Sequence, residues 1–109
     1  MATKLSELEI EARMEDLVDW TRAGDEIRKL FKFSSFPGAI GFVTQVAFLA
    51  EAAGHHPDID IRWRKVLLAL TTHDAGGLTE KDFDLAAQID DTLATRGGAS
   101  LSGAGRRRT

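Results

Sequence analysis

An alternation of apolar and charged residues between positions 59 and 72 constrains the fold more than any other feature of the sequence. The alternating residues are Ile59, Asp60, Ile61, Arg62, Trp63 and Arg64, followed by Val66, Leu68 and Leu70. Successive side chains of a β-strand point to opposite faces of a sheet, so this pattern indicates β structure. The run is too long for one typical strand. We therefore expect two strands that meet or bend near Arg64–Lys65, although no Gly or Asn marks a turn there.

A second alternation, from Trp20 to Phe33, predicts two short antiparallel strands with a turn at Gly24 and Asp25. Apolar residues at helical spacing predict three helices. They run from Leu5 to about Val18, from Ser35–Phe36–Pro37 to a stop at Gly54, and from a Thr79/Asp82 capping pattern to about Thr95. The residues expected to face the core are Ile10, Met14, Leu17 and Val18, then Ala39, Phe42, Val43, Val46, Ala50 and Ala53, and finally Leu85, Ala86, Ile89 and Leu93.

The order helix, two strands, helix, two strands, helix predicts an α+β fold. We expect a four-stranded antiparallel sheet with three helices packed on one face. With 109 residues the chain has room for one domain, which we place at residues 1–95. Residues 96–109 read as a flexible Gly/Ser/Arg tail, and a functional basic arm is the alternative for them.

The composition excludes several classes of function. The chain has no Cys, and therefore no disulfide, thiol nucleophile or thiolate metal site. It has 14 Lys and Arg against 17 Asp and Glu, and three of the basic residues are Arg106–Arg108. The preceding residues are thus clearly acidic and would repel phosphate backbones, so we expect no direct nucleic acid partner. No secretory signal begins the chain and no stretch reads as apolar enough to span a membrane, which favours a cytoplasmic protein with no membrane partner.

All three His of the chain fall at ends of predicted elements. His55 and His56, followed by Pro57, end the second helix, and His73 ends the last strand. Glu51 precedes His55 by four residues, and on a helix its carboxylate would lie one turn beneath that imidazole. A carboxylate there would favour the imidazolium and orient the ring, as a general acid requires.

Each of these residues also has a structural interpretation. A single His is more often structural than catalytic, His56–Pro57 could be only a helix exit, and Glu51 could be solvated. Asp82 is well explained as a helix cap. A metal site is a competing interpretation, but adjacent His55 and His56 point in different directions and no HExxH pattern is present, so we expect no metal.

The spacing Glu51-x-x-x-His55-His56-Pro57, followed by Trp63, His73 and Asp82, resembles the signature of the pterin-4a-carbinolamine dehydratases. The stretch from Thr72 to Asp82 is similar to bacterial members nearly residue for residue. The resemblance runs from about Leu5 to Leu93 and does not include the tail.

The resemblance implies a lyase that removes water from 4a-hydroxytetrahydrobiopterin to give quinonoid dihydrobiopterin, a step in tetrahydropterin recycling. It implies general acid/base catalysis by His, with no metal and no organic cofactor. One group must protonate the departing hydroxyl at C4a and another must accept the N5 proton, and imidazoles can do both near neutral pH.

The resemblance also assigns roles to residues. His55 and His73 match the family's acid–base pair, His56 its pterin-positioning His, and Asp82 a signature Asp whose role may be taken as mainly structural. Trp63 stands where many members have Tyr. The residues expected to bind or support the substrate are Glu51, Pro57, Thr72, Asp74, Ala75, Trp20 and Asp82.

The family is oligomeric, so the resemblance implies a homodimer or homotetramer. Some relatives act as coactivators or as assembly factors for a carbon-fixing enzyme, which makes a non-catalytic binding module on the same fold the alternative. The retained His residues favour the enzyme.

Overall fold

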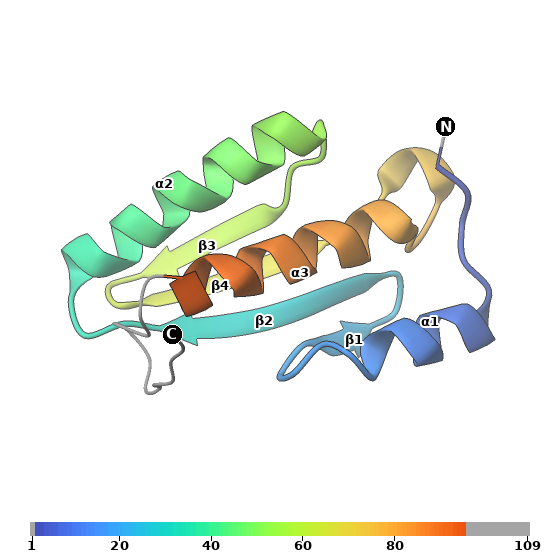
Figure 1. Cartoon of the computed structure of the whole chain (residues 1–109), viewed down its shortest axis with the longest axis horizontal. Helices are drawn as coiled ribbons and strands as arrows, with labels where there is room; N and C mark the ends of the chain where they lie inside the picture. The colour runs from blue at the N-terminus through green and yellow to red at the C-terminus, as the bar shows by residue number, and fades with distance from the viewer. Residues whose placement is uncertain (1, 96–109) are drawn as a thin grey trace.

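The computed structural model describes residues 2–95 and has the predicted order of elements (Figure 1). The helices are α1 (Glu7–Met14), α2 (Phe36–Ala53) and α3 (Glu80–Thr95), with a short 3-10 turn η1 (His73–Ala75). The strands are β1 (Thr21–Ala23), β2 (Glu26–Lys32), β3 (Asp58–Arg62) and β4 (Lys65–Leu70). The predicted tail and its Arg block lie outside the described residues.

The four strands form one antiparallel sheet in the order β1-β2-β4-β3, so the prediction of the fold is confirmed. In Figure 1, α3 lies in front of the sheet and α2 runs along its β3 edge. The two hairpins have two-residue turns. Gly24 takes the left-handed conformation in the first, and Trp63 takes it in the second, with φ of 64° and 56°. Trp63 therefore occupies a conformation usually left to Gly or Asn, which is why the sequence carries no mark of this turn.

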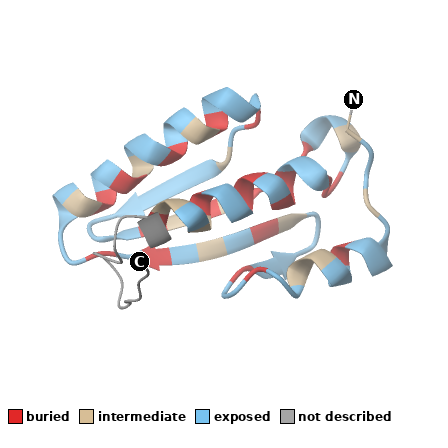
Figure 2. Cartoon of the chain, in the orientation of Figure 1, coloured by how far each residue is buried: buried red, intermediate tan, exposed pale blue. Residues whose placement is uncertain are grey.

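The core lies between the sheet and the two long helices (Figure 2). Phe42 of α2 packs on Phe31 and Phe33, with ring centroids 4.8 and 4.9 Å apart. The four predicted inward residues of α3 are buried, and Phe83 joins them. In α2 the prediction is wrong for Ala53, which is exposed because the helix has already passed the edge of the core.

Helix α1 is shorter than predicted. Ser6 and Glu9 form the expected capping box, but the helix ends at Met14. The next amide N–H groups bond three residues back rather than four, and Asp19 has φ of 67°, which turns the chain toward β1. Leu17 is buried as expected, whereas Val18 is 73% exposed, so its predicted inward position is wrong.

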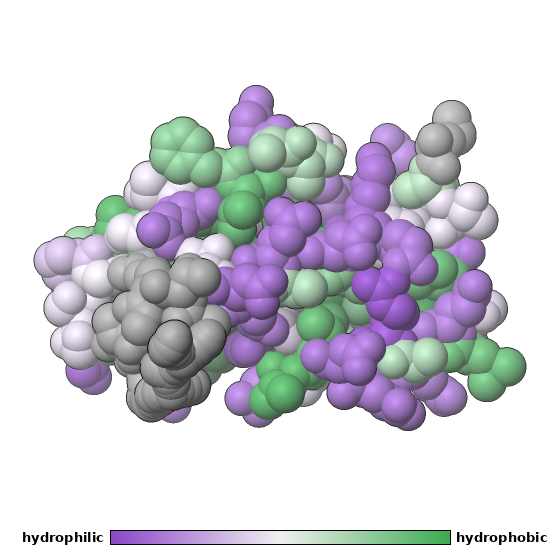
Figure 3. Space-filling model, viewed as in Figure 1, coloured by the Kyte–Doolittle hydropathy of each residue, from purple (hydrophilic) through white to green (hydrophobic). Residues whose placement is uncertain are grey.

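Helix α2 also corrects the prediction that no stretch is apolar enough to span a membrane. Its 18 residues have a mean hydropathy of 1.3, which meets that criterion by length and composition. Core helices of soluble proteins meet the same criterion, and α2 packs on the core through Ala39, Phe42, Val46 and Ala50. Only 22% of the helix is buried in the chain, however, and hydrophobic side chains lie at the surface over α2 (Figure 3).

Candidate functional site

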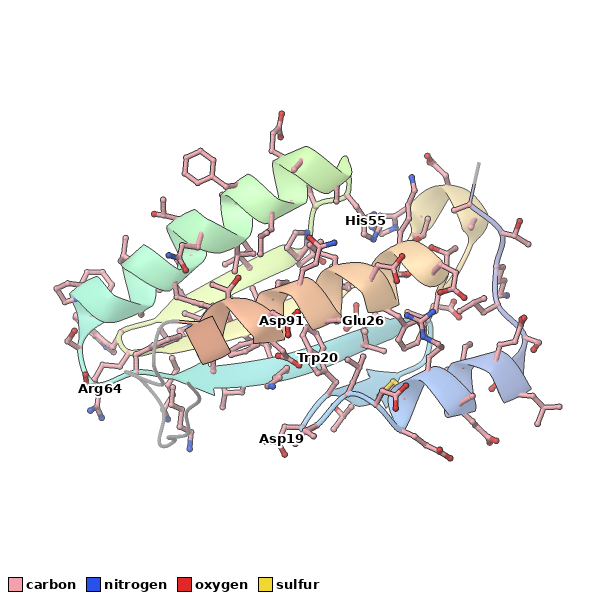
Figure 4. The ribbon with its side chains drawn as sticks, viewed as in Figure 1. Asp19, Trp20, Glu26, His55, Arg64 and Asp91 are labelled. Carbon is pink, nitrogen blue, oxygen red and sulfur yellow. The ribbon has the colours of Figure 1, made fainter. Side chains whose placement is uncertain are left out.

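The end of α2 places His55 and His56 on opposite sides of the chain. Gly54 has φ of 63°, and the N–H of His55 bonds to the carbonyl of Ala50 at 3.0 Å, as in a Schellman motif. The left-handed turn directs the His55 side chain inward, where it is 8% exposed, and leaves His56 in solvent. In Figure 4, His55 lies between the end of α2 and the start of α3.

The carboxylate partner of His55 is Asp82 rather than Glu51. His55 Nε2 lies 2.6 Å from Asp82 Oδ1, and the Asp82 side chain is fully buried. Glu51 instead contacts His56, with Oε1 and Nε2 3.0 Å apart and both side chains largely exposed. The expected stacking of Glu51 beneath His55 is therefore wrong, because the helix ends before position 55 and the turn at Gly54 reverses the two His side chains.

The buried Asp82 makes the predicted cap and also contacts His55. Its Oδ2 accepts the backbone N–H of Thr79 at 2.9 Å, which caps the start of α3. The same oxygen accepts the hydroxyl of Thr72 at 2.8 Å, while Oδ1 faces His55. A single carboxylate thus joins the end of α2, the end of β4 and the first turn of α3.

His73 lines the same pocket as the other two His. It begins η1 immediately after Thr72, whose carbonyl accepts the N–H groups of Ala75, Gly76 and Gly77. This tight turn holds His73 exposed at the surface. The pocket has a volume of about 290 Å³ and is lined by Gly54, His55, His56, Thr71, Thr72, His73, Asp74 and Lys81.

The structure thus brings together five of the predicted site residues at one pocket: the three His, Thr72 and Asp74. Neither Asp82 nor Glu51 lines the pocket, but each is bonded to a His that does: Asp82 is buried, and Glu51 is exposed. Pro57 and Ala75 are half-buried next to lining residues in the chain. Thr71 and Lys81 line the pocket but were not singled out by spacing; Thr71 continues the alternation of β4, and Lys81 follows the cap of α3.

Trp20 lies elsewhere in the molecule. It is 4% exposed, and its Nε1–H donates to Asp90 Oδ2 at 3.0 Å. Figure 4 shows it between α3 and β2, away from His55. Burial raises the pKa of Asp90, although Lys29 Nζ, 2.9 Å away, and Trp20 act in the opposite direction. A binding role for Trp20 stays a prediction that the pocket lining does not support.

Within residues 2–95, no group of three or more His, Cys, Asp or Glu side chains is arranged to hold a metal ion. The pairing of His55 with Asp82 is instead a hydrogen bond between a ring nitrogen and a carboxylate. Such a pair orients an imidazole, and it leaves the second ring nitrogen for proton transfer.

Comparisons with known proteins identify the family of the chain. The family model described as Pterin 4 alpha carbinolamine dehydratase matches residues 3–92. A protein of Roseiflexus sp. (strain RS-1), provisionally named a pterin-4-alpha-carbinolamine dehydratase, is 73% identical over 93 residues, covering 85% of this chain and 100% of that protein. A similarly named protein of Chloroflexus aurantiacus is 62% identical, covering 83% and 97%.

Two solved structures have a similar fold. A transcriptional coactivator/pterin dehydratase from Brucella melitensis has a TM-score of 0.79 at 32% identity, covering 82% of this chain and 97% of that chain. A pterin dehydratase-like protein identified as a RuBisCO assembly factor in the alpha-carboxysome has a TM-score of 0.55 at 26% identity, covering 66% and 83%.

Proposed function

Since the chain belongs to the pterin 4 alpha carbinolamine dehydratase family, we propose that it is a 4a-hydroxytetrahydrobiopterin dehydratase acting in tetrahydropterin recycling. The observation that carries the proposal is the meeting of all three His of the chain at one small pocket. His55 and His56 follow α2 whereas His73 begins η1, so the meeting of His73 with the other two is a property of the fold.

The proposed reaction requires only proton transfers. Protonation of the hydroxyl oxygen at C4a lets the C–O bond break and water leave. Loss of the proton on N5 then supplies the electron pair that forms the C4a=N5 double bond of quinonoid dihydrobiopterin. No electrons are gained or lost overall, so the reaction calls for an acid and a base but no redox cofactor. Positioned acid–base catalysis accelerates such steps by about 100-fold to 10,000-fold.

In this proposal His55 and His73 form the acid–base pair and His56 positions the pterin. His55 and His73 are suited to the first role because both line the pocket. The exposed His56, held by Glu51 at 3.0 Å, can meet the substrate at the pocket mouth. Thr72 and Asp74 line the site beside them, with Pro57 and Ala75 in the adjoining turns.

The test is the rate of dehydration of synthetic 4a-hydroxytetrahydropterin, compared with the uncatalysed rate. We expect catalysis by the wild-type protein and a loss in His73→Ala of about 100-fold or more in kcat. His73 is exposed, so this change should leave the fold intact. Glu11→Ala, at an exposed position of α1, is the matched control and should retain full activity.

A wild-type protein without catalysis, or a fully active His73→Ala, would contradict the proposal. The first result would favour the second candidate, a non-catalytic binding, coactivator or assembly module. The names of the two similar solved structures support that candidate, as does the apolar surface of α2.

We further propose that the protein is a cytoplasmic homo-oligomer in which β3 pairs with β3 of a second copy. Strand β3 lies at the edge of the sheet and all five of its residues are exposed. Its sequence is self-complementary: an antiparallel pair centred on Asp60 places Asp58 opposite Arg62 of the second copy and Ile59 opposite Ile61.

The apolar surface next to β3 supports this partner. Ile59 and Ile61 are 38% and 36% exposed, and Phe48 of the neighbouring helix α2 is 74% exposed. Trp63 at the adjoining turn is 79% exposed and contacts Phe36 edge-on. An exposed edge strand flanked by large apolar side chains is a template for another strand, and a second copy supplies one with matching charges.

A further inference from the structure

In a buried network of hydrogen bonds behind the pocket, the donor and the acceptor of each bond can be assigned in only one way. Thr72 has one hydroxyl hydrogen, and it donates that hydrogen to Asp82 Oδ2. The hydroxyl oxygens of Thr72 and Thr79 are 2.8 Å apart, so the hydrogen between them must come from Thr79. Thr79 Oγ1 in turn accepts the N–H of Lys81 at 3.2 Å. The donors therefore run from Lys81 through Thr79 and Thr72 to Asp82.

This direction makes Oδ2 of Asp82 a hydrogen-bond acceptor. Oδ2 faces two donors, the Thr72 hydroxyl and the Thr79 N–H, and cannot carry a hydrogen of its own without losing one of them. Oδ1 is left to face His55 Nε2 at 2.6 Å. Thr72, Thr79, His55 and Asp82 are all at most 8% exposed, so water does not replace these partners.

We propose that Asp82 holds His55 with its hydrogen on Nε2, and that Thr72 and Thr79 are positioning residues that keep Asp82 in this role. Because Nε2 is occupied, Nδ1 is the ring nitrogen that exchanges a proton with the substrate, a step that rests on the proposed function. Within residues 2–95, no hydrogen bond to His55 Nδ1 occurs. The arrangement follows the general logic of an acid–base His oriented by a buried carboxylate.

The tautomer of His55 tests the proposal without an activity assay. In a long-range ¹H–¹⁵N spectrum, recorded at a pH where the imidazoles are neutral, the unprotonated nitrogen of a ring gives a distinct downfield signal. We expect this signal at Nδ1 of His55 in the wild-type protein. Single His→Gln variants at positions 55, 56 and 73 assign the three rings. A wild-type His55 with the downfield signal at Nε2 would overturn the proposal.

Asp82→Asn should invert the tautomer. The two donors that face Oδ2 require an oxygen there, so the amide oxygen takes that position and the NH₂ group turns to His55 Nε2. Nε2 must then accept, and the hydrogen moves to Nδ1. We expect the downfield signal to move from Nδ1 to Nε2 in His55, with the exposed His56 as an internal reference. A folded Asp82→Asn with the wild-type pattern would overturn the proposed direction of the network.

Thr79→Val, with Thr79→Ser as the matched variant, tests the positioning role if Asp82→Asn does not fold. Val removes the hydroxyl that donates to Thr72, and Ser restores it. We expect kcat to fall by up to about 100-fold in Thr79→Val with little change in KM, and to recover in Thr79→Ser. An unchanged kcat in Thr79→Val, or a loss that Ser does not restore, would remove Thr79 from the network's function.

The two proposals can fail separately. A wild-type protein with the Nε2–H tautomer and no dehydration would contradict the dehydratase function and leave the assignment of the His55 tautomer in place. An active dehydratase whose His55 has its hydrogen on Nδ1 would do the reverse.

Discussion

At the scale of one residue, the partly buried Asp90 makes a contribution to stability that depends on pH. Its carboxylate joins Lys29 of β2 to Trp20 before β1, and burial raises its pKa above the ordinary value of 3.8 despite both partners. A carboxyl whose pKa is higher in the folded state than in the unfolded state binds its proton more tightly when the protein is folded. Its contribution to stability therefore rises as the pH falls toward 3.8 and is lost as the pH rises through the raised pKa.

Asp90→Asn removes this titration and keeps an oxygen for Trp20. We expect the free energy of unfolding of the wild-type protein, minus that of Asp90→Asn, to increase as the pH is lowered from about 6 to about 4. Urea unfolding at several pH values measures it. Asp91→Asn, at the exposed neighbouring position, controls for the loss of one acidic charge. A difference that is constant or decreases on acidification would contradict the expectation.

The sequence predicted which residues meet at the candidate pocket better than it predicted the contacts between their side chains. All three His were expected together because the ends of α2 and β4 can meet in a small sheet. The choice between Glu51 and Asp82 as the partner of His55 could not be made from spacing, since it depends on the left-handed turn at Gly54. The donor role of Thr79 was equally hidden, because a Thr before a helix is fully explained as a cap.

At the scale of elements, Gly54 connects helix termination to the site. Its φ of 63° is strained for residues that have a Cβ. No other residue lies close to the site of an added Cβ, so the strain comes from the backbone conformation and not from a clash with neighbouring residues. Gly41 lies inside the same helix with equally open surroundings and no positive φ. Substitutions at Gly54 and Gly41 therefore separate the effect of an added side chain from the effect of backbone conformation.

We expect Gly54→Ala to lower the free energy of unfolding by about 1–2 kcal/mol. Gly41→Ala should raise it by about 0.5–1 kcal/mol, because Ala has the higher helix propensity. Thermal and urea unfolding of both variants measure the two effects. Gly54→Ala should also lower kcat in the dehydration assay, since the turn directs His55 toward Asp82. Equal stability changes of the same sign in both variants would contradict this account of the turn.

The elements themselves were largely predictable because their signals are local. Period-two and helical patterns identified every strand and long helix, and Ser6, Ser35 and Gly54 marked three of the ends. The predictions were wrong or incomplete where an element ends although its periodic pattern continues, or where a turn contains no Gly or Asn. Val18 continues the helical spacing past Met14, and Trp63 forms a tight turn with no Gly or Asn.

At the scale of the whole molecule, the proposed β3 pairing can be tested by exchanging charges. In the proposed register, Arg62→Asp places two aspartates opposite each other at both ends of the strand pair, which is destabilising. We expect the wild-type protein to sediment as a dimer or larger assembly and Arg62→Asp to dissociate at higher concentration. Asp58→Arg/Arg62→Asp restores opposite charges and should restore assembly.

The double variant is the control, because it contains the disruptive substitution and differs from it only in the partner charge. Analytical ultracentrifugation over a range of concentrations distinguishes the cases. A wild-type protein that remains monomeric throughout would contradict the pairing, as would a double variant no better assembled than Arg62→Asp.

The self-complementary sequence of β3 restricts which substitutions the proposed pairing can accept. Around a two-fold axis every residue except the central one meets a different residue of the other copy, so one substitution alters two contacts at once. In the proposed pairing, Asp58 and Arg62 therefore form a coupled pair that a single change breaks twice and only a paired exchange repairs. Asp60, at the centre, would face its own image, and its bond to Arg62 at 3.1 Å supplies the countercharge within each copy.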